Sequence, residues 1–268
     1  MNARNKTLLI DCGNTYLKWC VLDTDNLTAQ QSLNHQEVSV LEIFKDLIES
    51  QASSCDSIVM VSVLGDVFLA GAKRLAEDAN YSLLNAQSDD TLINVTNGYS
   101  KPENLGNDRL VAMISAYTLA NDSQACIVID SGTATTIDAI DETGQHLGGV
   151  IFPGLELSLE SLGENTELPP KLNSNDQAIE ANGLATDTPQ AIASGCLLSL
   201  ASAIDGICNK MQRQIEENSS QTSVTVRKIL CGGGAKALLP YIENSYDYHE
   251  NLIMLGLKKI KESTVEND

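Results

Sequence analysis

The pattern of hydrophobic and polar residues at the start of the chain predicts a β-hairpin. Residues 8–10 form a buried run that ends at Asp11, a glycine turn follows, and residues 17–23 alternate between apolar and polar side chains. Short β-favouring runs on either side of a glycine turn are typical of two antiparallel strands. Residues 27–33 can add a third strand. We therefore expect the chain to open with three strands.

Helices and strands alternate after this hairpin, which is typical of an α/β fold. Apolar residues recur at helical spacing in several segments, and compact apolar runs between them predict strands. The expected elements are a helix over 38–51, a buried strand over 57–64, a helix from Asp66, as its cap, to Asp78, and a short strand over 82–85. A loop over 89–107 then leads to a helix that starts at Asn107 or Asp108 and ends near Asn121.

The same order of elements repeats from Ala125, which indicates a duplicated fold. The expected elements are strands over 125–129, 134–140 and 146–152, a helix over 154–162, an exposed connection over 163–181, a long apolar helix from Thr188 through Met211, a strand over 223–231, a helix from Ala235 and a last helix over 251–260. We place the domains at 1–121 and 122–268. Each would begin with a hairpin whose first strand ends in an aspartate.

Composition limits the classes of partner. The chain has 36 acidic and 17 basic residues and a formal charge of -19. This charge opposes binding to nucleic acid or to an anionic membrane surface. An anionic substrate must therefore be held by local N–H groups, metal ions and a few basic side chains.

Cysteine usage and the N-terminus predict a cytoplasmic protein. The seven cysteines are scattered, mostly in apolar runs, without a C-x-x-C pair, and this is typical of buried thiols in a reducing compartment. The first apolar run is too short for a signal peptide, and no window approaches the length of a transmembrane segment. The three histidines lack ligand spacing, so we expect no structural zinc.

The two hairpins are the candidate phosphate sites. Asp11 and Asp130 each precede a glycine turn, and Thr133 adds a hydroxyl to the second turn. Bare amides and hydroxyls donate to phosphate oxygens while a carboxylate holds the metal ion. The alternative is that each D-x-G sequence is only a structural turn. The pair, together with the glycines at 232–234, predicts the nucleotide cleft of a two-lobed phosphotransferase.

Phosphoryl transfer also needs a carboxylate to deprotonate the attacking hydroxyl. Asp108 is the candidate, because it lies at a helix start beside a long loop. The alternative is that Asp108 only caps its helix and Arg109 forms a salt bridge, and the local pattern favours neither. Asp138, together with Asp141 and Glu142, is expected to be a solvated turn residue.

Four motifs give the chain a family resemblance. They are Asp-Cys-Gly-Asn-Thr at 11–15, Pro-Glu-Asn-Leu-Gly-Asn-Asp-Arg at 102–109, Asp-Ser-Gly-Thr-Ala-Thr-Thr at 130–136, and Gly-Gly-Val-Ile-Phe-Pro-Gly at 148–154. Their order and spacing resemble type III pantothenate kinases over nearly the whole chain. Leu168-Pro169, residues 187–195, the glycines at 232–234 and residues 252–257 agree with this resemblance.

The resemblance implies the actin and sugar-kinase fold, with two ribonuclease H-like domains, mixed sheets and a nucleotide cleft between them. It also implies a homodimer that uses ATP to phosphorylate pantothenate to 4'-phosphopantothenate, the first step of coenzyme A synthesis. The long helix from Thr188 is apolar on more than one face, so we expect it at the two-fold interface.

The resemblance also assigns roles to residues. ATP phosphates and Mg²⁺ would be bound by Asp11, Cys12, Gly13, Asn14, Thr15, Tyr16, Leu17 and Lys18, with Thr133 contacting ATP. Pantothenate would be bound by Tyr99, Gly106, Asn107, Asp108, Arg109 and Thr188, with Asp108 as the catalytic base. Asp130 would hold a monovalent cation, K⁺ or NH₄⁺.

Two other functions are compatible with such a fold. A non-catalytic regulator could use it, but the presence of both hairpin acids and Asp108 argues against that reading. A phosphohydrolase of the same superfamily could use Asp108 to activate water. The motif from Tyr99 to Arg109 favours the kinase.

Overall fold

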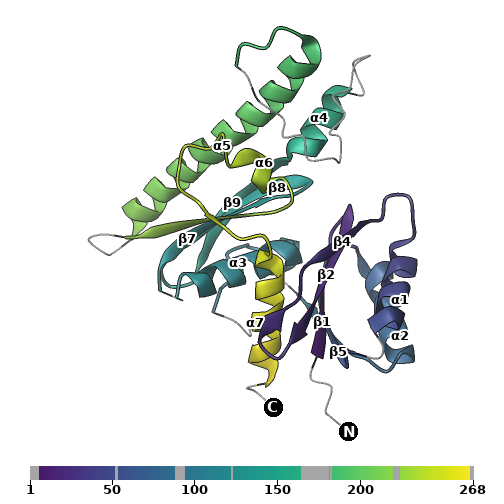
Figure 1. The fold of residues 1–268 in the computed structure, drawn as a ribbon. Coiled ribbons are helices and arrows are strands. Elements are labelled where there is room, and N and C mark those ends of the chain that lie inside the picture. Colours follow the sequence, from purple (N-terminus) through teal and green to yellow (C-terminus); the bar gives the residue numbers. More distant parts are fainter. Residues whose placement is uncertain are drawn as a thin grey trace. The chain divides into compact units, whose positions relative to one another are not determined.

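The computed structural model describes residues 6–51, 54–87, 94–121, 123–163, 181, 183–219 and 224–265 (Figure 1). The chain forms two compact units. The first comprises Met1–Ser115 with Asn251–Asp268, and the second comprises Ala116–Glu250. The division between them falls inside helix α3 (Asn107–Leu119). The expected connection over 163–181 and the Leu168-Pro169 motif lie almost entirely outside the described residues.

The first unit contains a mixed sheet in the order β3-β2-β1-β5-β6, with β4 also paired to β2. Its strands are β1 (Lys6–Cys12), β2 (Tyr16–Asp23), β3 (Asn26–Leu27), β4 (Gln31–Asn34), β5 (Ser57–Ser62) and β6 (Ser82–Ala86). Strands β1 and β2 form the predicted antiparallel hairpin, and β5 and β6 run parallel to β1. The prediction of one third strand over 27–33 is wrong, because β3 and β4 are separate. Their side chains are mostly exposed, so no buried face holds them in one continuous strand.

Helices α1 (Val40–Gln51) and α2 (Asp66–Asp78) pack together on one side of this sheet (Figure 1). The rings of Phe44 and Phe68 meet edge to face, with centroids 6.1 Å apart. The prediction that Asp66 caps α2 is wrong: the cap position is Gly65, and Asp66 is the first helical residue. An acid there still interacts favourably with the positive end of the helix dipole.

The C-terminal helix α7 (Leu252–Val265) packs on β1, β2 and β5. It also approaches α3, where the Cα of Gly256 lies against the backbone of Val111. The units differ from the predicted domains of 1–121 and 122–268 in two respects. The boundary lies between Ser115 and Ala116, so residues 116–121 belong to the second unit. Residues from Asn251 onward belong to the first unit, whereas the sequence placed them in a domain over 122–268.

The sheet of the second unit repeats the arrangement of the first. Its strands are β7 (Ala125–Ser131), β8 (Ala134–Ile140), β9 (His146–Pro153), β10 (Val226–Cys231) and β11 (Asp247–Tyr248), in the order β11-β10-β7-β8-β9. An antiparallel hairpin again continues into a third strand on one side, and parallel strands lie on the other. This matching topology confirms the predicted duplication. Strand β11 was not predicted.

Helices α4 (Leu155–Gly163), α5 (Thr188–Asn218) and α6 (Ala235–Leu238) complete the second unit. Helix α5 supplies much of the hydrophobic core against β7 and β8, with residues such as Leu197, Ala201 and Ile204 fully buried. By length and composition alone α5 could cross a membrane. Half of its apolar stretch is buried inside the protein, however, as in the core helix of a soluble protein.

Asp205 of α5 holds the chain that connects α6 to β11. Its carboxylate accepts hydrogen bonds from the backbone N–H of Glu243 at 2.7 Å, from the backbone and side chain of Asn244, and from the Tyr246 hydroxyl at 2.8 Å. Burial alone would raise the pKa of Asp205, but these four donors outweigh it and lower the pKa. The connection is therefore fixed to α5 by one buried charge.

Candidate active site

The first hairpin brings an acid and a base together at its open end. Asp11 is buried at the end of β1, and Lys18 stands directly opposite on β2, with its Nζ 3.7 Å from Asp11 Oδ2. The backbone N–H of Gly13 donates to the carbonyl of Tyr16 and closes the turn. Cys12 lies entirely in the core, so it can meet a ligand only through its backbone.

His35 supports this turn and was not singled out from the sequence. Its ring Nε2 lies 2.8 Å from the carbonyl oxygen of Gly13, and its backbone N–H donates to the carbonyl of Thr15. The turn between β1 and β2 is thus held from outside by the residue after β4. A lone histidine in a polar segment gives no sequence signal for such a contact.

Helix α3 positions the predicted catalytic acid. The Asn107 side chain donates to the carbonyl of Ser62 at 3.1 Å, which ties the start of α3 to the end of β5. Asp108 Oδ1 accepts the backbone N–H of Arg109 at 2.8 Å. A Cβ on Gly106 would stand 2.6 Å from the same oxygen, so the glycine leaves room for the carboxylate. Asp108 therefore makes a cap-like hydrogen bond at the start of α3.

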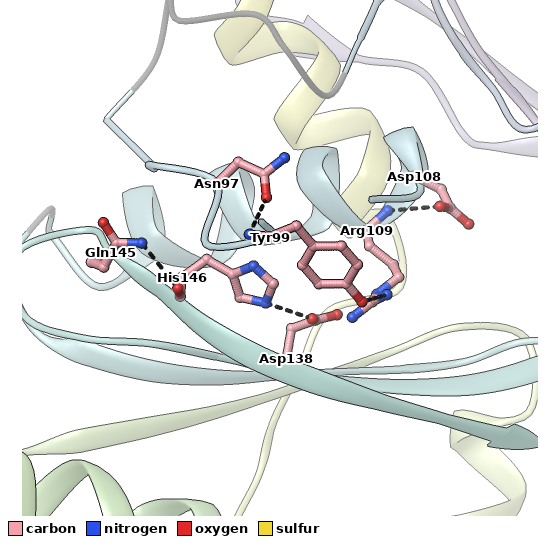
Figure 2. Close-up of polar contacts among 7 residues, drawn as sticks. All are labelled: Asn97, Tyr99, Asp108, Arg109, Asp138, Gln145 and His146. Carbon is pink, nitrogen blue, oxygen red and sulfur yellow. Dashed lines mark hydrogen bonds and ion pairs between the residues drawn. The ribbon is translucent and has the colours of Figure 1, made fainter. Parts of the chain in front are cut away.

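Tyr99 and Arg109 meet, as the shared motif implies (Figure 2). Arg109 is buried, its Nη1 donates to the Tyr99 hydroxyl at 2.8 Å, and its guanidinium carbon lies 5.5 Å from the centre of the Tyr99 ring. Asn97, which was not predicted, accepts the backbone N–H of Tyr99 at 2.9 Å and donates to the carbonyl of Pro102. The motif thus forms a connected polar cluster in which the guanidinium is held in place before any anion binds.

The second hairpin is enclosed by glycines from two other elements. Gly154, at the start of α4, donates its N–H to the carbonyl of Thr133 at 3.0 Å. Gly234 donates to the carbonyl of Ser131 at 2.8 Å, and Gly232 has φ +96°. A Cβ on Gly232 would overlap both Asp130 Oδ1 and the carbonyl oxygen of Ser131. These glycines therefore let the chain lie directly against the turn.

The Asp130 carboxylate is the candidate ligand for a cation at the second hairpin. Asp130 Oδ1 and the Ser131 carbonyl oxygen both lie against Gly232, and the carbonyl accepts the N–H of Gly234. Carboxylate and carbonyl oxygens are the ligands that hard cations prefer. Within the described part of the chain, three His, Cys, Asp or Glu side chains never cluster in a way that could hold a metal ion. A cation here would thus rely on one carboxylate and on backbone oxygens.

Thr188 is the first residue of α5 and is exposed. Asp187 caps this helix by accepting the backbone N–H of Gln190 at 2.9 Å. Thr188 belongs to the second unit, while Tyr99 and Arg109 belong to the first. Each unit therefore carries part of the predicted site residues.

Asp138 corrects one prediction from the sequence. It was expected to be a solvated turn residue, but it lies in β8, is buried, and has its Oδ1 2.9 Å from Nε2 of His146. Asp141 does form the turn, where its Oδ1 accepts from Thr143 and Gln145. The pattern was misread because a charged side chain usually faces solvent, even within a strand.

The cysteines match the prediction of buried thiols. All seven are buried. Burial raises the pKa of Cys20 and of Cys126 to about 12 each, so these thiols stay protonated at neutral pH.

Comparison with solved structures defines the class of protein. The chain is similar to MreB5 of Spiroplasma citri bound to AMPPNP, with a TM-score of 0.55, 11% identity, and coverage of 100% of this chain and 98% of that one. It is also similar to the ethanolamine utilization protein EutJ of Carboxydothermus hydrogenoformans, with a TM-score of 0.54, 14% identity, and coverage of 94% and 88%. The chain therefore has the actin and sugar-kinase type of fold that the sequence predicted.

Comparison of sequences defines the family. The family model for type III pantothenate kinase matches residues 7–210. The type III pantothenate kinase of Herminiimonas arsenicoxydans is 33% identical over 264 residues, covering 94% of this chain and 96% of the relative. That of Idiomarina loihiensis is 32% identical over 269 residues, covering 94% and 97%. The chain belongs to the type III pantothenate kinase family.

Proposed function

We propose that this protein transfers the γ-phosphoryl group of ATP to the primary hydroxyl of pantothenate, giving 4'-phosphopantothenate, with Asp108 as general base. The main support for this reaction is the match of residues 7–210 to the family model, because these residues include both hairpins and the Tyr99–Arg109 cluster. The reaction is the first step of coenzyme A synthesis, and it takes place in the cytoplasm. A kinase needs a divalent metal with ATP, and Mg²⁺ is the ion we propose.

The structure supports different roles for the two hairpins in binding MgATP. The amides of residues 14 and 15 in the turn and the Lys18 ammonium are suited to the phosphates of MgATP, because both are donors that stabilise negative charge. Thr133, exposed at the second turn, would add a hydroxyl donor. Asp11 would hold the Mg²⁺ that accompanies ATP, and this ion would supply positive charge to stabilise the phosphates.

The Tyr99–Arg109 cluster supports binding of pantothenate by its carboxylate. A guanidinium can donate two parallel N–H bonds to a carboxylate. Its contact with Tyr99 keeps it from adopting many conformations, which lowers the entropy cost of binding. Asp108, on the same turn of helix, would then orient the hydroxyl and accept its proton as the phosphoryl group transfers. Thr188 would complete the acceptor site.

The activity is tested by one assay. Purified protein with MgATP and K⁺ should form ADP only when pantothenate is added, and mass spectrometry should find phosphorylated pantothenate. Pantothenate-independent ADP formation would instead support a phosphohydrolase. Absence of product would support a regulator that has kept the fold.

Turnover should also depend on the monovalent cation. The Asp130 carboxylate at the second hairpin is the proposed ligand of an ion such as K⁺ or NH₄⁺. Replacing K⁺ by Na⁺ at equal ionic strength should lower kcat at least tenfold, and Asp130→Ala should be slow in either salt. Equal rates of wild-type protein in the two salts would contradict a cation site at Asp130.

We further propose that the protein is a homodimer through α4 and α5. An apolar groove of about 430 Å³ runs between these helices, with Leu157, Leu162 and Ile192 in its lining. In this lining, the side chains of Leu157 and Leu162 are 39% and 44% exposed. Light scattering should give twice the 28.8 kDa of one chain. A monomer at micromolar concentration would rule the dimer out.

A further inference from the structure

The ring of His35 fixes the direction of one peptide group in the turn between β1 and β2. Its Nε2 lies 2.8 Å from the carbonyl oxygen of Gly13. A carbonyl oxygen can only accept a hydrogen bond, so Nε2 carries the hydrogen. In a trans peptide the C=O group and the N–H of the next residue point in opposite directions. The N–H of Asn14 is therefore aimed away from His35.

The backbone of His35 holds the other end of the same turn. Its N–H donates to the carbonyl of Thr15 at 3.0 Å. The N–H of Gly13 donates across the turn to the carbonyl of Tyr16, also at 3.0 Å. Asn14 lies between these fixed residues and is exposed. Its N–H therefore projects from a turn whose peptide groups are held on both sides.

Strand β4 brings His35 to this position. The strand pairs antiparallel with β2, and its last residue, Asn34, lies opposite Tyr16. His35 is the next residue, so it lies beside the turn that precedes β2. All four residues of β4 are exposed, so burial of apolar area contributes little to its stability. The strand therefore serves to place His35 against the first turn.

A fixed donor is valuable at this turn because its surroundings include negative charge. Asp11 is buried at the end of β1, and the whole chain has a formal charge of -19. Backbone N–H groups bind anionic oxygens strongly, but a hydrogen bond weakens steeply when the donor points away from the acceptor. A peptide group that could rotate would also have to be ordered when the ligand binds, which costs conformational entropy.

We propose that His35 is a positioning residue that aims the N–H of Asn14 at the phosphates of ATP. It acts through the carbonyl of Gly13 and has no contact with the nucleotide itself. The inference rests on the proposed function, because that function places the phosphates at the first turn. It adds a residue outside the shared motifs to the groups that determine affinity for ATP.

The test compares His35→Ala with wild-type protein in two ligand titrations of the melting temperature. One ligand is AMPPNP with Mg²⁺, and the other is pantothenate, so neither titration requires turnover. The dissociation constant follows from the rise of the melting temperature with ligand concentration. That of AMPPNP should increase at least about fivefold, because the donor to a charged oxygen is no longer aimed. That of pantothenate should change less than twofold.

Two further variants separate positioning from a general structural role. In His35→Gln the side-chain amide nitrogen replaces Nε2 as the donor to Gly13, so the AMPPNP dissociation constant should return to within about twofold of wild type. Gln36→Ala is the matched control, because Gln36 is the exposed neighbour of His35, and it should change neither dissociation constant.

Three results would overturn the inference. They are an unchanged AMPPNP dissociation constant in His35→Ala, equal losses of AMPPNP and pantothenate affinity, and a His35→Gln variant that binds AMPPNP no better than His35→Ala. Wild-type protein that is not stabilised by AMPPNP would overturn it as well. If wild-type protein binds AMPPNP but forms no phosphorylated pantothenate, the proposed function fails, while the AMPPNP titrations still decide the role of His35.

Discussion

Asp108→Asn is expected to lose most of its turnover while keeping its melting temperature and its affinity for pantothenate. The asparagine oxygen can still accept the N–H of Arg109, which Asp108 accepts at 2.8 Å, so the start of α3 should be preserved. An amide cannot accept the proton of the substrate hydroxyl, and loss of a general base lowers rates by roughly 10²- to 10⁴-fold. The measurements are kcat, thermal melting and calorimetric binding of pantothenate.

Glu103→Gln is the matched control for this experiment. Glu103 is an exposed acid in the short 3₁₀ segment before α3, so its replacement removes a nearby charge without touching the proposed base. It should keep kcat within about twofold. If Asp108→Asn melts early yet keeps its turnover per folded molecule, Asp108 is only structural, and Asp11 becomes the next candidate for the base.

Elements with a clear hydrophobic pattern within their own residues could be predicted from the sequence. Both hairpins, the long helix from Thr188 and the parallel strands β5, β6 and β10 have local hydrophobic patterns, and the structure contains them. Elements without a buried face were missed. Strand β11 has only two residues, and the exposed strands β3 and β4 were merged into one. Such elements are set by pairing with a distant strand, which no local pattern reports.

The candidate site was predicted in the same uneven way. Tyr99 and Arg109 lie in one motif, so their contact could be anticipated. The contacts of His35 with the first turn and of His146 with Asp138 could not. The second depends on a bulge that reverses the alternation of β9, and a strict period of two assigns His146 to the wrong face.

The membership of α7 in the first unit was missed for a related reason. Its helical pattern was recognised, but a pattern of buried residues does not say which sheet they cover. The close approach of Gly256 to Val111 is a tertiary contact between residues 145 positions apart. Only the folded chain shows that the helix returns to the sheet where the chain began.

The second prediction with a large expected effect concerns the glycines at 232–234, whose surroundings differ. The sequence assigned all three to the predicted nucleotide cleft. In the structure Gly232 has φ +96°, and its Cα stands against Asp130 Oδ1 and the Ser131 carbonyl, whereas a Cβ on Gly233 would meet nothing within 4 Å. Gly232→Ala combines backbone strain with a clash, so it should lower the free energy of unfolding by about 3 kcal/mol.

The same substitution should lower kcat at least tenfold in the molecules that remain folded, because the new methyl group displaces the carboxylate proposed to hold the cation. Chemical denaturation and steady-state kinetics in saturating K⁺ measure the two effects separately. Gly233→Ala is the control and should stay within about 0.5 kcal/mol of wild type, as expected for an open surface position. Equal losses in both variants would mean that the glycines act through the flexibility of the strand-to-helix turn, and that close packing against Asp130 is not what the second hairpin requires.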